Sequence, residues 1–378
     1  MKRTIAGGFT ILFGLLLVVV TRCQESQPGS QKDDKPAWQL AAEKNALPLI
    51  EKKQLNSLVI GVIDRTGKRH FLTLGEKPAN LDKLDENTIF EIGSVTKTMT
   101  SFLLADAIQR LEAKLDDPVQ SYLPDDMQVP KLGDKAITVE HLATHTSGFP
   151  RLPVGLGTKL TVDSKLQKDP YSQFDAAQLK KSLADTRPKV SAKPKVDYSN
   201  YGAGLLGFAL ASKYKKSYEA LLQERLFGPL EMKSSSVNVP ASDQTRFIDG
   251  FTTANSPCAH WTFQDTLAGA GAVRSTAADM LNYLEAASGR LKKLQPSFEL
   301  VAAPQYEMGP RMQIGLAWII IEMNKKRAWW HNGGTGGFSS FAGFSKNPGV
   351  AVIVLSNRFV TGEVDKIGMS ILDALTKQ

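Results

Sequence analysis

Runs of apolar, β-branched residues lie near both ends of this chain, on either side of a long central part with helical periodicity. Near the N-terminus, 58–64 and 70–74 predict a hairpin that turns at 65–67. Further strands are predicted near the C-terminus, followed by a closing helix: 316–323, 328–331, 339–344, 350–355 and helix 364–377. Strands from both ends and helices between them indicate an α/β (α+β) fold, an antiparallel sheet with a helical insertion lobe.

The central part predicts short helices at 139–144, 201–214 and 218–227, the last ending at Gly228-Pro229. Between them, 151–195 has few periodic segments and is expected to be a long surface connection around 174–183. A connection of that length inside a domain is usually functional or mobile, so it is a candidate to overhang an active-site cleft.

Ser94-Val95-Thr96-Lys97 opens one of the helical patterns, after the strand-like run 88–92 and Gly93. Residues three apart share a helix face, so Lys97 is expected beside the Ser94 hydroxyl. A serine at a helix N-terminus can lose its proton to a neighbouring amine and attack a carbonyl. The alternative is a helix-capping serine with a solvated lysine, and the same spacing recurs at Ser212 and Lys215.

Two further motifs follow Ser94 in order, and they distinguish it from Ser212. Tyr198-Ser199-Asn200 is the only Tyr-x-Asn in the sequence and precedes Ser212. His331-Asn332-Gly333 then opens a glycine-rich run that extends to Gly337. No Gly-x-Ser-x-Gly element is present, which argues against an α/β-hydrolase.

These motifs resemble those of the penicillin-recognising serine hydrolases, which comprise class C β-lactamases, DD-peptidases and esterase relatives. The stretches 141–150 and 267–280 are also similar to segments of that family, and the resemblance runs from about Leu55 to the C-terminus. It implies a β-lactamase/transpeptidase-like fold with a five-stranded antiparallel sheet flanked by terminal helices. It also implies a serine hydrolase that forms an acyl-enzyme with β-lactams or D-Ala-D-Ala-like amides.

The resemblance also assigns roles to individual residues. Ser94, Lys97 and Tyr198 would be catalytic, with either Lys97 or Tyr198 as the base. The backbone N–H groups of Ser94 and Gly334 would form the oxyanion hole. The substrate-binding residues would be Asn200, His331, Asn332 and Gly333.

Two of these assignments carry electrostatic expectations. A nearby ammonium is expected to lower the pKa of Tyr198. The third motif begins with His331, where lactamases of the family usually have lysine. We therefore expect a protonated His331 to pair with a substrate carboxylate, and efficient β-lactam turnover is in question. A peptidoglycan DD-carboxypeptidase/endopeptidase, a carboxylesterase and a non-hydrolytic penicillin-binding sensor are the alternatives.

The sequence predicts no cofactor and no metal. His141 and His145 have helical spacing, but the Glu of His-Glu-x-x-His is missing, so structural roles are expected. The glycine run lacks the Gly-Lys-Ser/Thr ending of a phosphate loop. The net charge is +8, and no nucleic-acid motif accompanies it, so no nucleic-acid partner is expected. The family resemblance implies a small-molecule β-lactam or a peptidoglycan stem peptide as the partner.

The first residues read as an export signal, with Lys2 and Arg3 before the apolar run 5–20. Arg22 precedes Cys23 where lipidation would require a small residue, so 1–24 is assigned as a signal peptide or a membrane anchor. The polar stretch after it predicts a tether over 25–45. A catalytic domain over 46–378 follows, with a sheet lobe at 46–93 and 265–378 and a helical lobe at 94–264. The protein is thus expected in the periplasm or cell envelope, with membrane contact only through its N-terminal segment.

Overall fold

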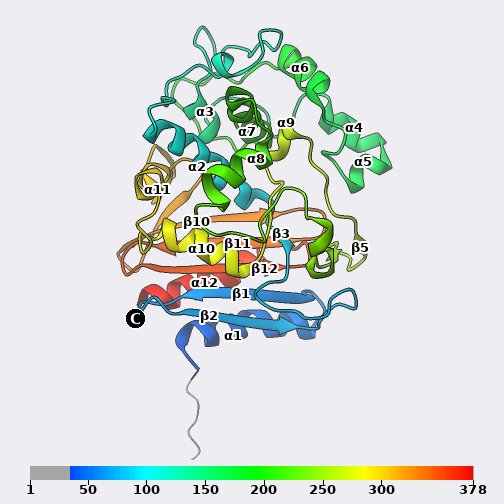
Figure 1. Ribbon diagram of the computed structural model, residues 1–378, viewed down its shortest axis with the longest axis vertical. Helices are drawn as coiled ribbons and strands as arrows, with labels where there is room; N and C mark the ends of the chain where they lie inside the picture. The colour runs from blue at the N-terminus through cyan, green and yellow to red at the C-terminus, as the bar shows by residue number, and fades with distance from the viewer. Residues whose placement is uncertain (1–34, 378) are drawn as a thin grey trace, which may run out of the picture. The chain divides into compact units, whose positions relative to one another are not determined.

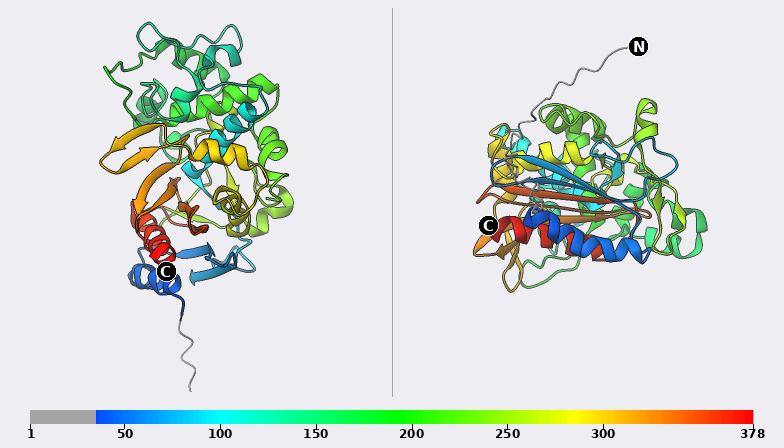
Figure 2. Two further views of the ribbon diagram at one scale, coloured as in Figure 1. Left: turned by 90° about the vertical axis from the view of Figure 1, so that its left-hand side faces the viewer. Right: turned by 90° about the horizontal axis from the view of Figure 1, so that it is seen from below.

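The first and last strands of the described residues lie side by side in one antiparallel sheet (Figures 1 and 2). The structure is a computed structural model and describes residues 35–377. The strand order is β2-β1-β12-β11-β10-β9-β8-β7, so the N-terminal hairpin pairs directly with the last strand. These strands are β1 (Ser57–Ile63), β2 (Arg69–Gly75), β7 (Tyr306–Gly309), β8 (Met312–Ile314), β9 (Ile319–Met323), β10 (Lys326–Gly334), β11 (Ser339–Ser345) and β12 (Val350–Ser356).

The sheet has eight strands within the described residues, so the expected five-stranded sheet is wrong in its strand count. The additional edge includes β7 and β8, strands of only four and three residues, which are too short for a periodic pattern to be recognised in the sequence. The apolar run predicted as one strand at 316–323 is also interrupted. Ala317 has a φ of +69°, and β9 begins only at Ile319.

Each face of the sheet contributes to a separate apolar core. In β1, Leu58, Ile60 and Val62 pack with α1 (Ala37–Glu51) and α12 (Glu363–Lys377), whereas Val59 and Ile63 belong to the core on the opposite face. Successive strand residues point to opposite faces. A strand covered on both sides is therefore apolar at almost every position, as this one is.

Helix α1 corrects the predicted tether over 25–45, which is wrong from Ala37 onward. Trp38, Ala42 and Ala46 lie four residues apart and are buried beside α12, which holds this segment on the sheet. A stripe of one tryptophan and two alanines is a weak apolar signal, and the sequence reading missed it. The predicted signal or anchor at 1–24 and the first ten residues of the tether lie outside the described residues.

Helix α2 (Thr96–Gln109) lies at the centre of the helical part, above the sheet in Figure 1. It is buried on all sides for most of its length, as expected of a helix surrounded by other elements. The remaining elements are β3 (Phe90–Glu91), η1 (Gly93–Val95), η2 (Val119–Tyr122), α3 (Val139–Ala143), α4 (Leu156–Val162), α5 (Ser164–Lys168), α6 (Ala176–Asp185), α7 (Asn200–Tyr214), α8 (Tyr218–Leu222), η3 (Gln223–Phe227), η4 (Ala241–Arg246), β4 (Gly250–Phe251), β5 (Pro257–Cys258), α9 (Asp265–Ala268), β6 (Arg274–Ser275), α10 (Ala277–Ala287) and α11 (Gln295–Ala302).

The segment 151–195 contains three short helices, where the sequence indicated mainly a surface connection. Aspartates begin two of them: Asp163 accepts hydrogen bonds from the backbone at the start of α5, and Asp175 does so at the start of α6. A capping side chain satisfies N–H groups that a helix start leaves without partners. Local capping thus explains helices that have little periodicity.

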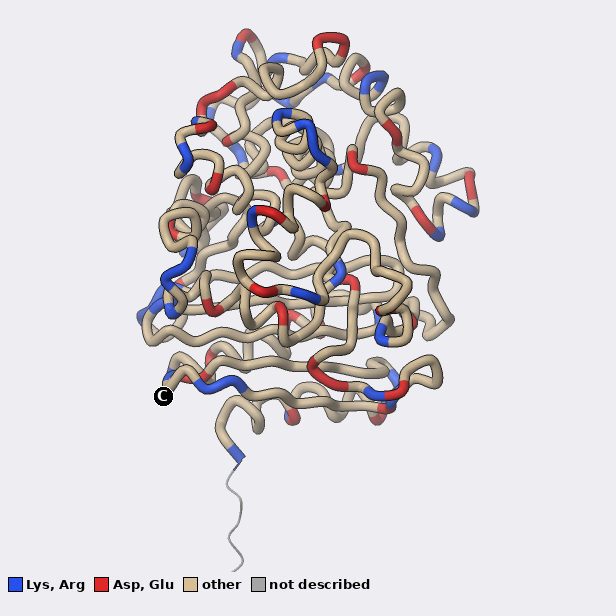
Figure 3. The backbone as a smooth tube through the Cα atoms, viewed as in Figure 1, with Lys and Arg blue, Asp and Glu red and all other residues tan. Residues whose placement is uncertain are grey.

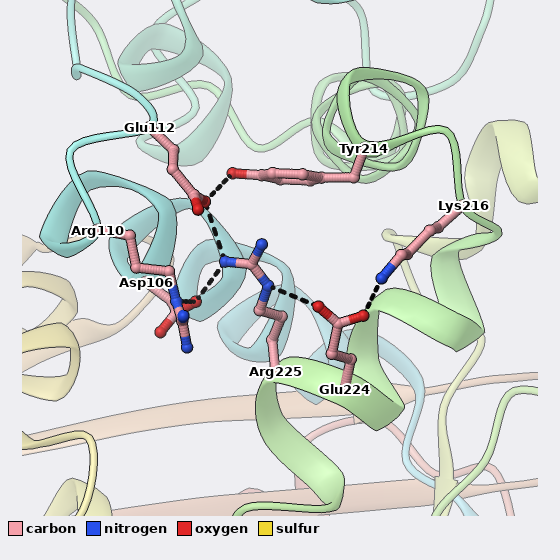
Figure 4. Close-up of polar contacts among 7 residues, drawn as sticks. All are labelled: Asp106, Arg110, Glu112, Tyr214, Lys216, Glu224 and Arg225. Atoms are coloured by element: carbon pink, nitrogen blue, oxygen red, sulfur yellow. Dashed lines mark hydrogen bonds and ion pairs between the residues drawn. The ribbon is translucent and has the colours of Figure 1, made fainter.

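An ion-pair network ties α2 to the far side of the helical part (Figure 4). The Arg225 guanidinium pairs with Asp106 at 3.1 Å and with Glu112 at 3.0 Å. Tyr214 donates a hydrogen bond to Glu112, and Glu224 pairs with Arg225 at 3.4 Å. The Arg225 and Asp106 side chains are only 11% and 5% exposed, so loss of Arg225 would remove a buried ion pair and leave Asp106 with Arg110, 2.7 Å away, as its remaining ion-pair partner.

Positively and negatively charged residues are spread over the described chain (Figure 3). Between residues 35 and 377, none of the helices combines the length and the apolar character that a bilayer span requires.

Candidate active site

Ser94 lies in a tight turn between β3 and α2. The preceding Gly93 has a φ of +50°, and a Cβ atom on it would lie 2.6 Å from the backbone nitrogen of Gly334. Only glycine fits a position with both a left-handed backbone and so close a neighbour. The turn therefore brings the Ser94 backbone beside the end of β10, where the oxyanion hole was predicted.

Lys97 is one turn into the helix, and its side chain is buried beneath Ser94. Its Nζ lies 2.9 Å from Ser94 Oγ and donates a hydrogen bond of 2.6 Å to the carbonyl of Ala270. Burial holds the pKa of Lys97 well below its usual range, and the charge of Arg151 lowers it further. A neutral Lys97 amine can donate one N–H to the Ala270 carbonyl and still use its lone pair to accept the proton of the Ser94 hydroxyl.

Tyr198 lies against Lys97, with the Lys97 Nζ 4.9 Å from the ring centroid. Burial raises the pKa of Tyr198 above its usual value, although the hydrogen bond with Ser94 and the charge of Arg151 oppose this. The expectation that an ammonium would lower this pKa is therefore wrong, because burial outweighs the charges. The phenol keeps its proton and can donate it.

Asn200 begins helix α7, and Ser199 rather than Asn200 caps that helix by accepting from the N–H of Gly202 at 2.9 Å. The side-chain amide of Asn200 donates to Tyr171 Oη at 3.1 Å. Its Oδ1 is buried and has no hydrogen-bond partner among residues 35–377. This oxygen is available to accept an N–H from a substrate.

His331 does not face the cleft as the sequence analysis expected. Its side chain is buried, and Nδ1 lies 2.6 Å from the carbonyl oxygen of Asn332. Burial lowers the pKa of His331 to about 3, and the charge of Lys97 acts in the same direction. The imidazole is therefore neutral near pH 7 and does not provide the positive charge that the carboxylate prediction required.

The other predicted residues of β10 line the cleft. Asn332 donates to Asp365 Oδ2 at 2.8 Å, which connects the strand to α12. Gly333 passes so close to the turn that a Cβ on it would overlap the carbonyl oxygen of Ile92. The cleft has a volume of about 700 Å³, and Ser94, Tyr198, Asn200, Asn332, Gly333 and Gly334 all contribute to its lining.

The two histidines of the 141–150 stretch have separate contacts. His141 Nδ1 accepts from the backbone N–H of Thr138 at 3.0 Å and helps to cap α3. His145 is buried, its ring centroid lies 4.7 Å from that of Tyr198, and Nδ1 accepts from the Ser199 N–H at 3.3 Å. His145 thus packs against the Tyr198 ring, a contact that could not be predicted from its spacing to His141.

The second Ser-x-x-Lys pair lies at the end of a helix. Ser212 belongs to the last turn of α7, and Lys215 is the residue that ends this helix, with a φ of +52°. Neither residue lines the cleft. The order of the motifs had already favoured Ser94, and the structure gives the physical difference between the two serines.

Several cleft residues carry no motif, and Arg151, Tyr171 and Trp261 are among them. Arg151 and Tyr171 belong to the connection that was a candidate to overhang the cleft. Trp261 comes from the segment after β5, for which the sequence gave no signal.

Comparisons with known proteins agree on one family. The model of the beta-lactamase family matches residues 41–376. The chain is 27% identical over 347 positions to the beta-lactamase of Escherichia coli K12, covering 82% of this chain and 86% of that protein. It is 29% identical over 318 positions to the D-alanyl-D-alanine-carboxypeptidase/endopeptidase AmpH of the same strain, covering 79% and 78%.

Solved structures show the same fold. A beta-lactamase/D-alanine carboxypeptidase from Pseudomonas syringae superposes with a TM-score of 0.74 at 23% identity, covering 89% of this chain and 98% of that one. The D-alanine carboxypeptidase AmpC from Burkholderia cenocepacia also gives 0.74, at 24% identity and with the same coverage. With Ser94 beside an amine at the base of a cleft, these findings show that the chain is a serine hydrolase that belongs to the beta-lactamase family.

Proposed function

We propose that Ser94 is acylated by β-lactams or by amides that resemble D-Ala-D-Ala, and that water then hydrolyses the acyl-enzyme. This proposal rests on the 2.9 Å contact between Ser94 Oγ and the amine of Lys97, because burial of that amine favours its neutral form. The names of relatives support the substrate class, since they include beta-lactamases and a D-alanyl-D-alanine-carboxypeptidase/endopeptidase.

In acylation, Ser94 Oγ bonds to the substrate carbonyl carbon while its proton passes to the Lys97 amine. The oxyanion accepts hydrogen bonds from the backbone N–H groups of Ser94 and Gly334. Tyr198 donates its phenolic proton to the departing nitrogen and recovers one from Lys97, so the C–N bond breaks and a Ser94 ester remains. Loss of one oxyanion donor would cost about 3 kcal/mol of transition-state stabilisation.

In deacylation, a water molecule attacks the ester carbonyl, and its proton returns to the Ser94 oxygen by way of Lys97 and Tyr198. The raised pKa of Tyr198 supports a relay through a neutral phenol instead of a standing phenolate. Of the two candidate bases, the geometry favours Lys97. Asn200, Asn332 and Gly333 would bind the substrate amides.

A DD-carboxypeptidase/endopeptidase is the second candidate. A neutral, buried His331 in place of a cation supports it, because the lysine usual in lactamases of the family is missing.

A substrate panel separates the candidates: nitrocefin, a peptide ending in D-Ala-D-Ala, and p-nitrophenyl butyrate. Turnover of nitrocefin well above that of the peptide indicates a lactamase, and the reverse indicates a DD-peptidase. Turnover of the ester alone contradicts the proposal in favour of a carboxylesterase. A burst of acylation without steady-state turnover indicates a penicillin-binding sensor.

We also propose that the protein is exported to the periplasm or cell envelope, with 1–24 as signal or anchor, and that the catalytic part, expected over 46–378, begins earlier, with helix α1 at Ala37. The apolar run 5–20 after Lys2 and Arg3 supports export. Fractionation of cells that express a C-terminally tagged chain tests this. The tag is expected in the envelope or periplasm, and full-length protein in the cytoplasm would refute export.

A further inference from the structure

The cleft carries one charge of each sign in its lining. Among its lining residues only Arg151 and Asp365 are charged; Lys97 is buried and is not part of the lining. Asp365 accepts from Asn332 at the α12 side, whereas Arg151 lies above Tyr198 with its guanidinium carbon 5.1 Å from the ring centroid. A carboxylate in the cleft is therefore attracted toward the Tyr198 side and repelled from the Asn332 side.

The Arg151 side chain is exposed and makes no ion pair with a carboxylate of residues 35–377. The guanidinium carbon lies over the Tyr198 ring, and the guanidinium N–H groups make no hydrogen bond to residues 35–377. The guanidinium edge presents N–H donors in the planar arrangement that binds a carboxylate through two parallel hydrogen bonds.

The backbone of Arg151 is fixed to the catalytic segment. Its carbonyl accepts hydrogen bonds from the N–H groups of Asn200 at 2.9 Å and Tyr201 at 3.3 Å. The preceding carbonyl, of Pro150, accepts from Ser199 Oγ at 2.7 Å. Backbone hydrogen bonds thus hold Arg151 beside the residues that shape the site, although the paired residues are 49 or 50 positions apart in the chain. Its charge also reaches the site, because it contributes to the lowered pKa of Lys97.

We propose that Arg151 binds a carboxylate of the substrate and gives the enzyme its preference for anionic substrates. This specificity role rests on the function proposed above. It assigns to Arg151 the charge that the buried, neutral His331 does not supply. The carboxylate belongs either to the leaving part of the substrate or to its acyl part, and matched substrates distinguish the two.

The test compares Arg151→Gln with the parent on two pairs of substrates. Benzylpenicillin and its methyl ester differ in a carboxylate on the leaving part. Mono-p-nitrophenyl glutarate and p-nitrophenyl butyrate differ in a carboxylate on the acyl part. Any change at Lys97 affects both members of a pair, so the ratio of their kcat/KM values isolates carboxylate binding.

We expect Arg151→Gln to lower this ratio by about 10- to 100-fold in one pair, the range for a lost hydrogen bond to a charged group. The affected pair identifies the part that carries the carboxylate. Arg151→Lys should retain part of the ratio. Arg311→Gln, an exposed arginine on the β7–β8 hairpin, should leave it unchanged. Unchanged ratios in both pairs, or equal losses for charged and neutral members, would overturn the proposal.

A binding measurement keeps the inference testable if turnover fails. Calorimetry with Ser94→Ala and intact benzylpenicillin gives a Kd without acylation. Adding Arg151→Gln should weaken that Kd by about tenfold or more if the leaving-part carboxylate is bound, and glutarate tests the acyl-part site in the same way. If Arg151→Gln weakens the binding of neither ligand, the proposed role of Arg151 is refuted. If Arg151→Gln weakens binding but the parent protein turns over no substrate, only the proposed hydrolysis is refuted.

Discussion

Gly93→Ala tests how closely the Ser94 turn must approach β10. The new methyl carbon would lie 2.6 Å from the Gly334 nitrogen and 2.8 Å from its carbonyl oxygen. The Gly334 peptide must retreat by about 0.4 Å for the shorter contact to reach 3.0 Å, and by about 0.8 Å to reach 3.4 Å. This peptide carries a proposed oxyanion donor, so the methyl group displaces the donor directly.

The expected loss has two separable parts. The left-handed backbone at φ +50° costs an alanine about 1–2 kcal/mol of stability. Complete loss of an oxyanion donor lowers the rate about 100- to 1,000-fold, so a displaced donor should lower acylation by about 10- to 100-fold. Stopped-flow acylation by nitrocefin and urea unfolding measure the two parts.

Gly155→Ala is the matched control, since Gly155 has a φ of +86° and nothing within 4 Å of the place that a new methyl group would take. It bears backbone strain without moving Gly334, so it should lose stability but keep its acylation rate. Gly93→Ala that acylates within about threefold of the parent would refute the account of the oxyanion hole.

Three further predictions concern charge. The charge of Arg151 lowers the pKa of Lys97, so Arg151→Gln should raise that pKa and move the acid limb of the pH profile of kcat/KM for p-nitrophenyl butyrate to higher pH. An acid limb that does not move would contradict Lys97 as the base. Since the pKa of His331 is about 3, KM for benzylpenicillin should stay flat from about pH 6 to 8, and a several-fold rise would show that His331 titrates there. Arg225→Ala should lower the free energy of unfolding by about 3 kcal/mol, whereas Lys181→Ala, which breaks an exposed ion pair, should lower it by less than about 1 kcal/mol. Equal losses in urea titrations would show that the buried network stabilises the fold no more than an exposed ion pair does.

The sequence predicted those parts of the molecule that depend on local pattern. The terminal strands, helix α7 and the short helix α3 follow from periodicity, and the order of Ser94, Tyr198 and His331 indicated one site. Strands β7 and β8 and helix α1 were missed because their apolar signals are weak. Here the packing partners, and not the segment itself, determine the structure.

The electrostatic errors have another cause. Tyr198 was expected to have a lowered pKa beside an ammonium, and His331 was expected to be protonated, but burial decides both pKa values, and burial depends on contacts across the whole chain. Arg151 escaped notice for a similar reason. Its carbonyl accepts hydrogen bonds from N–H groups of a distant segment, which place it at the cleft, and these contacts cannot be predicted from residue spacing in the sequence.

The most direct test of the central claim is covalent labelling of Ser94. A fluorescent penicillin should form an adduct that intact-mass spectrometry detects and peptide mapping assigns to Ser94. The account predicts that Ser94→Ala abolishes the adduct and that Ser212→Ala, at the other Ser-x-x-Lys, retains it. An adduct that persists in Ser94→Ala would contradict the account.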